Sequence, residues 1–218
     1  DCLLSRGLGD VYKRQVLVML GVEGEIPELA HHNFLFSDDW SDDFDAVFNG
    51  PVASRPQAAS QSIYVSKPSA TDPSVAPAGH ENLFVLVPVP ADPSVGHGDM
   101  YRGEASEQVR RIADAAVEQI AARCGVAGLG RRIVVKQTLG PADFAERYNA
   151  WSGGSIGPAH TLRQSAFLRG SNKSRKLDSL LYAGATTTPG VGVPMCLISA
   201  ENVLKRIRGD RSSGPLDR

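Results

Sequence analysis

A periodic apolar segment in the middle of the chain constrains the fold more than any other feature. From Tyr101 to Cys124, apolar residues recur every three or four positions, which places them on one face of an α-helix. Gly125 follows and suits the left-handed conformation at which helices commonly end. The residues of the stripe are Val109, Ile112, Ala113, Ala116, Val117, Ile120 and Cys124. A helix with one such face has to be covered by a sheet or by other helices.

Segments rich in β-branched, leucine and aromatic residues supply that covering layer. Strands are expected at residues 16–21, 33–37, 62–66, 83–87, 132–138 and 180–183. The strands at 62–66 and 83–87 are expected to be antiparallel neighbours, because a loop with turn chemistry joins them. Other segments predict a helical turn at 26–30, a strand or short helix at 44–48, a loop at 51–61, and helices at 141–147 and 194–208. This mixture predicts an α+β fold with a sheet-rich portion and a helical layer.

Charge is spread unevenly, although the formal net charge is only -1. Residues 23–49 carry eight acidic side chains and no Lys or Arg, whereas residues 163–211 carry nine basic side chains against three acidic ones. With so small a net charge, the chain as a whole offers no electrostatic reason to bind nucleic acid. Both regions fit solvated faces, and the basic region also fits an edge that meets anionic lipid head groups.

Potential metal ligands form no pattern typical of a metal site, so none is predicted. Cys2, Cys124 and Cys196 are far apart and fit a reduced, cytoplasmic protein. His31 and His32 are adjacent and would point to opposite faces of a strand, which favours hydrogen bonding over shared metal binding. The acidic run 38–43 lacks the glycine spacing of a calcium loop and predicts a solvated connector.

Two further classes of protein are disfavoured by the sequence. Ser165 and Ser199 lack the glycine-flanked elbow of a hydrolase nucleophile. The apolar stretch 16–22 is about a third of the roughly 20 residues that a membrane-spanning helix needs.

The first fifteen residues are expected to be foreign to the fold. Asp1–Gln15 shows neither helical nor strand periodicity. Its last six residues, from Asp10 onward, resemble a peptide translated from sequencing adaptor at the ends of metagenomic reading frames. We therefore expect this tail to be non-native and the natural protein to continue upstream of Val16.

A glycine-rich turn precedes the last expected helix. The turn contains Gly184, Gly190 and Gly192, and the helix begins near Pro194, a residue suited to a first turn. Glycine lets another molecule approach the backbone, and a helix N-terminus offers free N–H groups with partial positive charge. The pattern fits a seat for an anion or a polarised carbonyl, and equally a turn that packs a helix closely on a strand. Met195 stands where a dinucleotide fingerprint has glycine.

The same turn resembles the C-terminal signature of bacterial-type phytoene desaturases. The resemblance covers residues 184–194 and continues into Ser199–Glu201. Collinear resemblances occur at His31–His32, Phe36–Trp40, Ser62–Val65, Pro68–Pro77, Val85–Pro90 and Gln164–Phe167. One departure is Thr187–Thr188, where many members have Thr-His, so no role of that histidine carries over.

The resemblance implies an FAD-dependent desaturase of a long polyene such as phytoene, in carotenoid biosynthesis. It implies a Rossmann-like FAD domain split in sequence, a sheet-rich substrate domain that forms a tunnel, and peripheral attachment to the inner face of the membrane. Together with the expected non-native tail (1–15), it divides the chain into a mainly substrate-binding region (16–160), the last strand and helix of the FAD domain (161–210) and a flexible tail (211–218). The implied flavin contacts are Gly184, Ala185, Thr186, Pro189, Gly190, Val191, Gly192, Val193, Pro194 and Met195.

Several assignments stay open at this stage. Phe34, Phe36, Phe84 and Phe167 fit either the lining of the tunnel or the core. No catalytic base is identified, and the chain alone is expected to be inactive and not to retain FAD, since its first dinucleotide motif would lie upstream. A carotenoid ketolase or isomerase on the same scaffold and a non-catalytic polyene- or lipid-binding module are the alternative functions. The oligomeric state cannot be derived from the sequence.

Overall fold

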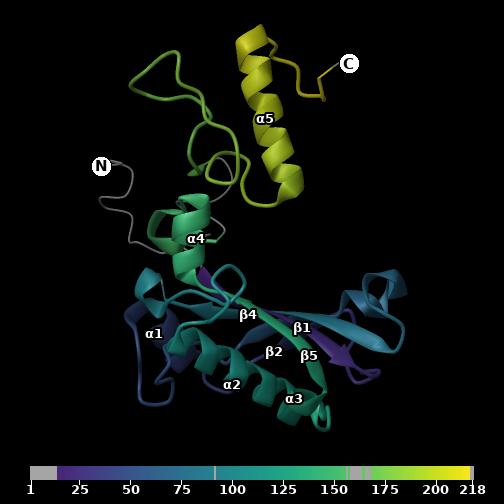
Figure 1. Cartoon of the computed structure of the whole chain (residues 1–218). Coiled ribbons are helices and arrows are strands. Elements are labelled where there is room, and N and C mark those ends of the chain that lie inside the picture. Colours follow the sequence, from purple (N-terminus) through teal and green to yellow (C-terminus); the bar gives the residue numbers. More distant parts are fainter. Residues whose placement is uncertain (1–13, 91, 156, 158–163, 165–167, 217–218) are drawn as a thin grey trace. The chain divides into compact units, whose positions relative to one another are not determined.

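The computed structural model describes residues 14–90, 92–155, 157, 164 and 168–216. The chain divides into a larger unit within residues 13–155 and a smaller unit within residues 156–218. Each unit has its own secondary structure (Figure 1).

The larger unit is built on a five-stranded antiparallel sheet. Its strand order is β2-β3-β4-β1-β5, so the first strand of the chain lies between the fourth and the fifth. The strands are β1 (Arg14–Glu23), β2 (His32–Leu35), β3 (Ile63–Ser66), β4 (His80–Val89) and β5 (Ile133–Leu139). The helices of this unit are α1 (Trp40–Asn49), α2 (Glu107–Cys124), α3 (Leu129–Arg132) and α4 (Pro141–Tyr148).

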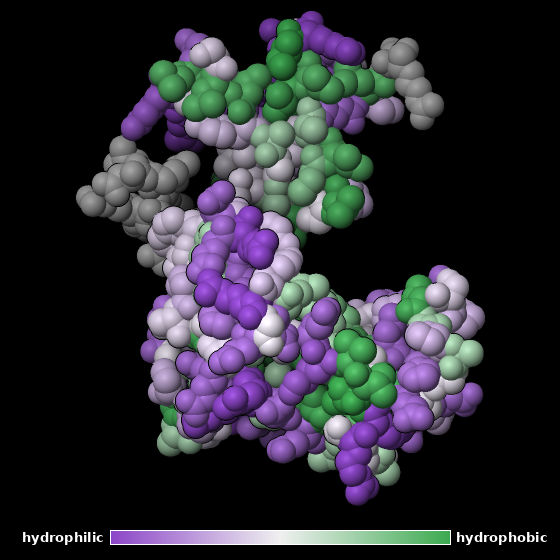
Figure 2. Space-filling model, viewed as in Figure 1, coloured by the Kyte–Doolittle hydropathy of each residue, from purple (hydrophilic) through white to green (hydrophobic). Residues whose placement is uncertain are grey.

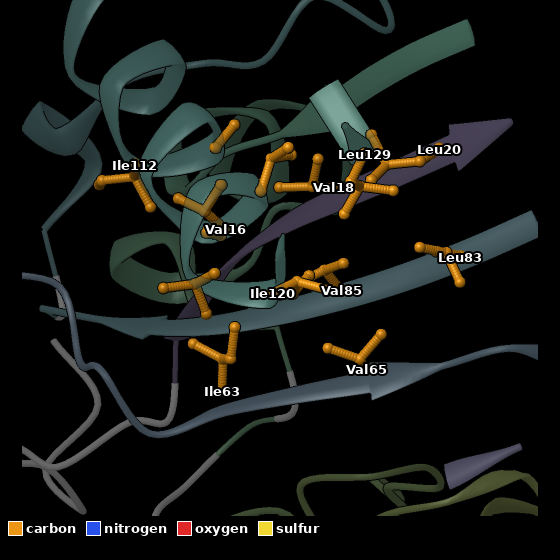
Figure 3. Close-up of a cluster of buried hydrophobic side chains, with 14 of the residues drawn as sticks. Val16, Val18, Leu20, Ile63, Val65, Leu83, Val85, Ile112, Ile120 and Leu129 are labelled. Atoms are coloured by element: carbon orange, nitrogen blue, oxygen red, sulfur yellow. The ribbon is translucent and has the colours of Figure 1, made fainter. Parts of the chain in front are cut away.

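The core lies between α2 and one face of the sheet. Every second residue of β1 from Val16 to Val22 is buried, and β4 contributes buried residues in the same alternation from Leu83 to Val89. Side chains from α2, α3 and three strands meet in this cluster (Figure 3). The predicted helical stripe is confirmed, because its six positions from Val109 to Ile120 are buried and Cys124 packs at the margin.

The predicted start of α2 is wrong by six residues. The helix begins at Glu107 because the amides of Arg102 and Gly103 donate to the carbonyl of Asp99 and close a separate turn. The predicted end is confirmed, since Gly125 adopts the left-handed conformation with φ 72°. The antiparallel pairing of β3 with β4 is also confirmed.

The structure also decides three further expectations for the larger unit. Residues 26–30 form no helical turn, since only the amide of Leu29 closes back on Ile26 and both side chains are buried in the core. Residues 44–48 belong to a helix, α1. Strand β1 begins two residues before the predicted start at Val16. Arg14 and Gln15 pair with Val89 and Pro88 of β4 and so continue the ladder. Residues 1–13 lie outside the described part of the chain.

The acidic run 38–43 is not a solvated connector. Asp39 caps α1 by accepting from the amide of Asp42 at 3.1 Å, so the helix starts inside the run. Asp43 is buried and forms an ion pair with Arg55, whose Nε lies 2.9 Å from its carboxylate. Sequence periodicity could not reveal this, because the partner lies in the loop that follows the helix.

The smaller unit contains α5 (Val193–Arg208) and the irregular segment that precedes it. The predicted helix is confirmed, and it ends at Gly209, which is left-handed with φ 70°. The strand expected at 180–183 is wrong. Among the described residues of this unit, Leu181 forms only an isolated bridge with Lys173, and a strand needs a continuous ladder. The chain still combines helices with a five-stranded sheet, as expected for the α+β class.

Candidate functional site

The glycine turn before α5 has backbone that only glycine adopts readily. Gly184, Gly190 and Gly192 have φ values of 119°, 145° and 112°. A Cβ added at Gly184 or Gly192 would meet no atom of the chain within 4 Å. The turn therefore presents bare backbone to open space at these two points. That geometry fits close approach by a flat group from outside the chain.

The first turn of α5 adds a favourable electrostatic environment. The first intrahelical bond runs from the amide of Cys196 to the carbonyl of Gly192 at 2.9 Å. The amides of Val193 and Met195 precede that bond and have no acceptor inside the helix. Both residues are exposed, so these donors and the positive end of the helix dipole are open to an electron-rich partner.

A buried hydroxyl holds the turn against α5. Ser199 is the buried residue of α5, with an exposed fraction of 0%, and its Oγ accepts from the amide of Gly184 at 3.0 Å. The hydroxyl of Thr187 lies 2.8 Å from the same oxygen and donates to the carbonyl of Gly184 at 3.0 Å. The start of the turn is thereby fixed to the second turn of α5.

Asn172 completes this clamp from the preceding loop. Its Nδ2 lies 2.9 Å from the Ser199 hydroxyl and 3.0 Å from the carbonyl of Tyr182. Its backbone carbonyl accepts from the amide of Tyr182 at 2.8 Å. Asn172 is buried, so these contacts are made away from water and are costly to break.

Arg169 fixes the other side of the turn. Its Nε and Nη2 both donate to the carbonyl of Ala185, at 2.9 and 2.6 Å, and its side chain is almost fully buried. The amide of Thr188 donates to Gly170 at 2.8 Å. Arg169, Asn172 and Ser199 were missed as supports of the turn. The sequence offered one signal for these supports, a serine among the apolar positions of the last helix. Nothing in the sequence pairs that serine with Asn172.

Replacing Ser199 with alanine should loosen the turn. The amide of Gly184 and the side chain of Asn172 would each lose a buried acceptor, a loss of about 1–3 kcal/mol. Hydrogen exchange at the Gly184 amide should accelerate by about tenfold or more. Ser212→Ala, an exposed substitution in the same unit, should leave that rate unchanged. Equal protection of Gly184 in both variants would show that Ser199 does not hold the turn.

The second candidate feature is the sheet face opposite α2. Strand register places Phe34, Tyr64, Leu86, Leu17 and Leu139 in one row across all five strands. These positions alternate with the core residues, so their side chains point to the other face. The row is apolar from edge to edge; Phe34 at one edge is 64% exposed, whereas Leu17 and Leu139 are buried. The sheet thus carries a second apolar face.

Aromatic rings extend this row onto α1. Successive ring centroids from Phe34 through Phe36, Trp40 and Phe44 to Phe48 lie 5.5–6.2 Å apart, and Phe34 lies 5.1 Å from Tyr64. We call these six residues the aromatic stripe. Its five members on β2, α1 and the segment between them are about half exposed or more. Phe34 and Phe36 are therefore not core residues. Phe84 is half-buried, and Phe167 lies outside the described residues.

Apolar surface is also exposed elsewhere. Figure 2 shows it along α5 and over β5. The exposed residues there are Val193, Leu197, Ile198, Leu204 and Ile207 on α5, and Val134 and Val135 on β5. Among the described residues, no helix is both long and apolar enough to cross a bilayer.

The paired histidines make hydrogen bonds, as expected. His31 Nδ1 lies 2.5 Å from the Thr71 hydroxyl, and His32 Nδ1 lies 2.7 Å from the Tyr64 hydroxyl. The expected opposite orientation is wrong, because His31 precedes β2 and the two rings lie 4.3 Å apart. Within the described part of the chain, no three His, Cys, Asp or Glu side chains are grouped to hold a metal.

Comparison with known proteins identifies relatives of this chain. No family model matches it. It is 45% identical over 194 residues to the carotenoid 3,4-desaturase of Haloarcula japonica, covering 89% of this chain and 36% of that protein. It is 34% identical to a zeta-carotene-forming phytoene desaturase of Myxococcus xanthus, covering 88% and 35%. A 4,4'-diapophytoene desaturase of Staphylococcus aureus is 32% identical, with 91% and 38% covered.

The chain therefore spans a little more than a third of the length of these relatives. The similarity extends over nearly all of its own length, and each of the three relatives is named as a desaturase. Over about nine-tenths of its length, the chain is thus homologous to proteins named as carotenoid, phytoene and diapophytoene desaturases.

Proposed function

We propose that this chain is part of a flavin-dependent enzyme that desaturates a long polyene such as phytoene. The observation that carries the proposal is the similarity to three carotenoid desaturases over about nine-tenths of the chain. The larger unit would supply substrate-binding surface. The smaller unit would supply the last part of a split Rossmann-like FAD domain. The enzyme would work at the inner face of the cytoplasmic membrane.

The glycine turn fits the edge of a flavin. The bare backbone at Gly184 and Gly192 allows close approach, and the free amides of Val193 and Met195 suit a carbonyl edge that gains negative charge. The residues that would make these contacts are Gly184, Ala185, Thr186, Pro189, Gly190, Val191, Gly192, Val193, Pro194 and Met195. Bound FAD supplies the two-electron acceptor that removal of hydrogen from a saturated carbon pair requires.

The contribution of this chain to the reaction would be positioning. Arg169, Asn172 and Ser199 hold the turn in one geometry before any ligand arrives, which avoids reorganisation during the reaction. A polyene has no polar group to recognise, so its binding depends on burial of apolar surface and contact with aromatic rings. The aromatic stripe offers such a surface and would keep water from the chain of carbon atoms.

Binding of a polyene to the aromatic stripe tests this proposal on the chain itself. The chain has two tryptophans, and only Trp40 lies in the stripe. In a Trp151→Phe variant, a carotenoid should quench the remaining fluorescence saturably, because its absorption overlaps the emission of Trp40. Adding Phe36→Ala should weaken binding about five- to tenfold, as expected for loss of an aromatic contact.

The matched control is Trp40→Phe, which leaves Trp151 as the reporter. Quenching of Trp151 as strong as that of Trp40, or unchanged affinity in Phe36→Ala, would exclude the stripe as the polyene surface. A product that is oxygenated or merely isomerised, when the complete enzyme is supplied with phytoene, would exclude desaturation in favour of a ketolase or an isomerase.

A further inference from the structure

A basic hollow lies in the smaller unit, beside the glycine turn. Its volume is about 1150 Å³, and it is bounded by the segment 168–181, the C-terminal half of α5 and residues 209–212. Six cationic side chains and two carboxylates line it. These residues are Arg169, Lys173, Arg175, Lys205, Arg206 and Arg211, with Asp178 and Asp210. The hollow thus gathers much of the basic region 163–211 around one space.

Three of the six cations already have partners inside the unit. Lys173 pairs with Asp178 at 2.8 Å, and Arg169 is bound to the carbonyl of Ala185. Lys205 donates to the carbonyl and hydroxyl of Ser212, at 3.0 and 3.3 Å. These side chains define the walls of the hollow and are not available as primary ligands.

The two carboxylates are also committed. Asp178 holds Lys173, and Asp210 accepts from the amide of Ser212 at 2.8 Å and from its hydroxyl at 3.1 Å. These hydrogen bonds, that of the amide first, lower the pKa of Asp210. Six cations against two carboxylates still leave an excess of four positive charges around the hollow.

Three arginines therefore remain around the hollow without an anionic partner. Among the described residues, no carboxylate forms an ion pair with Arg175, Arg206 or Arg211. The three arginines are exposed and line the same hollow, so a multivalent anion bound there would be attracted to all three charges. Neutral donors share the lining, namely Ser171, Ser179 and Asn202.

We propose that this hollow binds a phosphate group, with Arg175, Arg206 and Arg211 as its charged ligands. Phosphate matches the planar fork of arginine and accepts several hydrogen bonds at once, which uses both the arginines and the neutral donors. The phosphate can belong to an anionic lipid head group or to a soluble phosphate compound. The site is separate from polyene and flavin binding, and it stands whether or not the desaturase proposal does.

Binding to two probes separates the sources. The purified chain is mixed with vesicles of phosphatidylcholine, with vesicles that also contain phosphatidylglycerol, and with inorganic pyrophosphate in a calorimeter. Arg206→Gln should weaken binding of the effective probe about fivefold, and the triple variant at Arg175, Arg206 and Arg211 should weaken it at least twentyfold. Arg208→Gln removes the same charge from α5 at a residue that does not line the hollow, and it should weaken binding much less than Arg206→Gln.

Each outcome decides the proposal. Binding to phosphatidylglycerol vesicles that depends on Arg206 but not on Arg208 supports a lipid head group. Pyrophosphate binding with the same dependence, without vesicle binding, supports a soluble phosphate ligand. Binding of neither probe, or equal weakening by Arg206→Gln and Arg208→Gln, overturns the site, because attraction would then reflect only the overall charge of the helix.

Discussion

Asp43→Asn should destabilise the larger unit by about 3–5 kcal/mol, the usual cost of breaking a buried ion pair. Asp43 and Arg55 are both buried, and the guanidinium would lose its carboxylate while staying away from water. The same carboxylate accepts from the hydroxyls of Ser60 and Ser62, at 2.7 Å each, and from the amide of Gln61 at 3.0 Å. Urea unfolding monitored by circular dichroism measures the change.

The matched control is Asp45→Asn, which removes an exposed carboxylate from the same helix. It should change the free energy of unfolding by less than about 0.5 kcal/mol. Equal effects of the two substitutions would show that the Asp43 network does not support the fold. This network also ties α1, and with it the exposed rings of the aromatic stripe, to the loop before β3.

Stability in acid follows from the same group. Burial by itself raises the pKa of Asp43, but hydrogen bonds from Ser62, the Gln61 amide, Ser60 and Arg55 outweigh it and lower the pKa from 3.8 to about 2. A depressed pKa contributes stability that is fully present above the unfolded value and is lost as pH falls from about 4 through 2. Asp43→Asn should therefore flatten the pH dependence of unfolding in that range.

Gly192→Ala should abolish flavin retention by a complete enzyme that contains this chain. Gly192 has φ 112° and ψ 149°, a backbone conformation that costs an L-residue of order 1–3 kcal/mol. The added methyl would also occupy the open space into which we place the flavin edge. Together these effects should weaken flavin binding more than tenfold, measured as flavin absorbance per protein after desalting.

The complete enzyme for this test is a chimera. Residues 16–216 replace the matching segment of the Haloarcula japonica relative. Gly209→Ala is its control, because Gly209 also has a positive φ, of 70°, and open space around it, but lies at the far end of α5. It should cost a little stability and leave flavin bound. Loss of flavin in Gly209→Ala but not in Gly192→Ala would contradict the assignment of the turn.

The local sequence pattern predicted secondary structure and burial correctly wherever a residue's environment depends on its near neighbours in the chain. The periodic stripe of α2, the glycine after Cys124 and the alternation in β4 all report burial that repeats within a few positions. The strand expected at 180–183 failed for the opposite reason. Its apolar residues suit a sheet, but a strand forms only where another strand supplies the ladder.

The supports of the candidate site depend on residues distant in sequence. Asn172 reaches Ser199 across 27 positions, and Asp43 reaches Arg55 across 12. Neither spacing has a period that a helix or strand would impose. The aromatic stripe was only half anticipated, because a phenylalanine in a short strand suits a core as well as an exposed face. Its assignment required the register of β2 and the direction of α1.

The most direct test of the central claim is the product formed by the chimera. It is supplied with the carotenoid that the unmodified Haloarcula japonica enzyme converts, and the product is measured by mass and visible absorption. We predict a product that has lost pairs of hydrogen atoms and absorbs at longer wavelength. A chimera that folds and retains flavin, yet returns the carotenoid unchanged, would contradict the claim that this chain supplies part of a carotenoid desaturase.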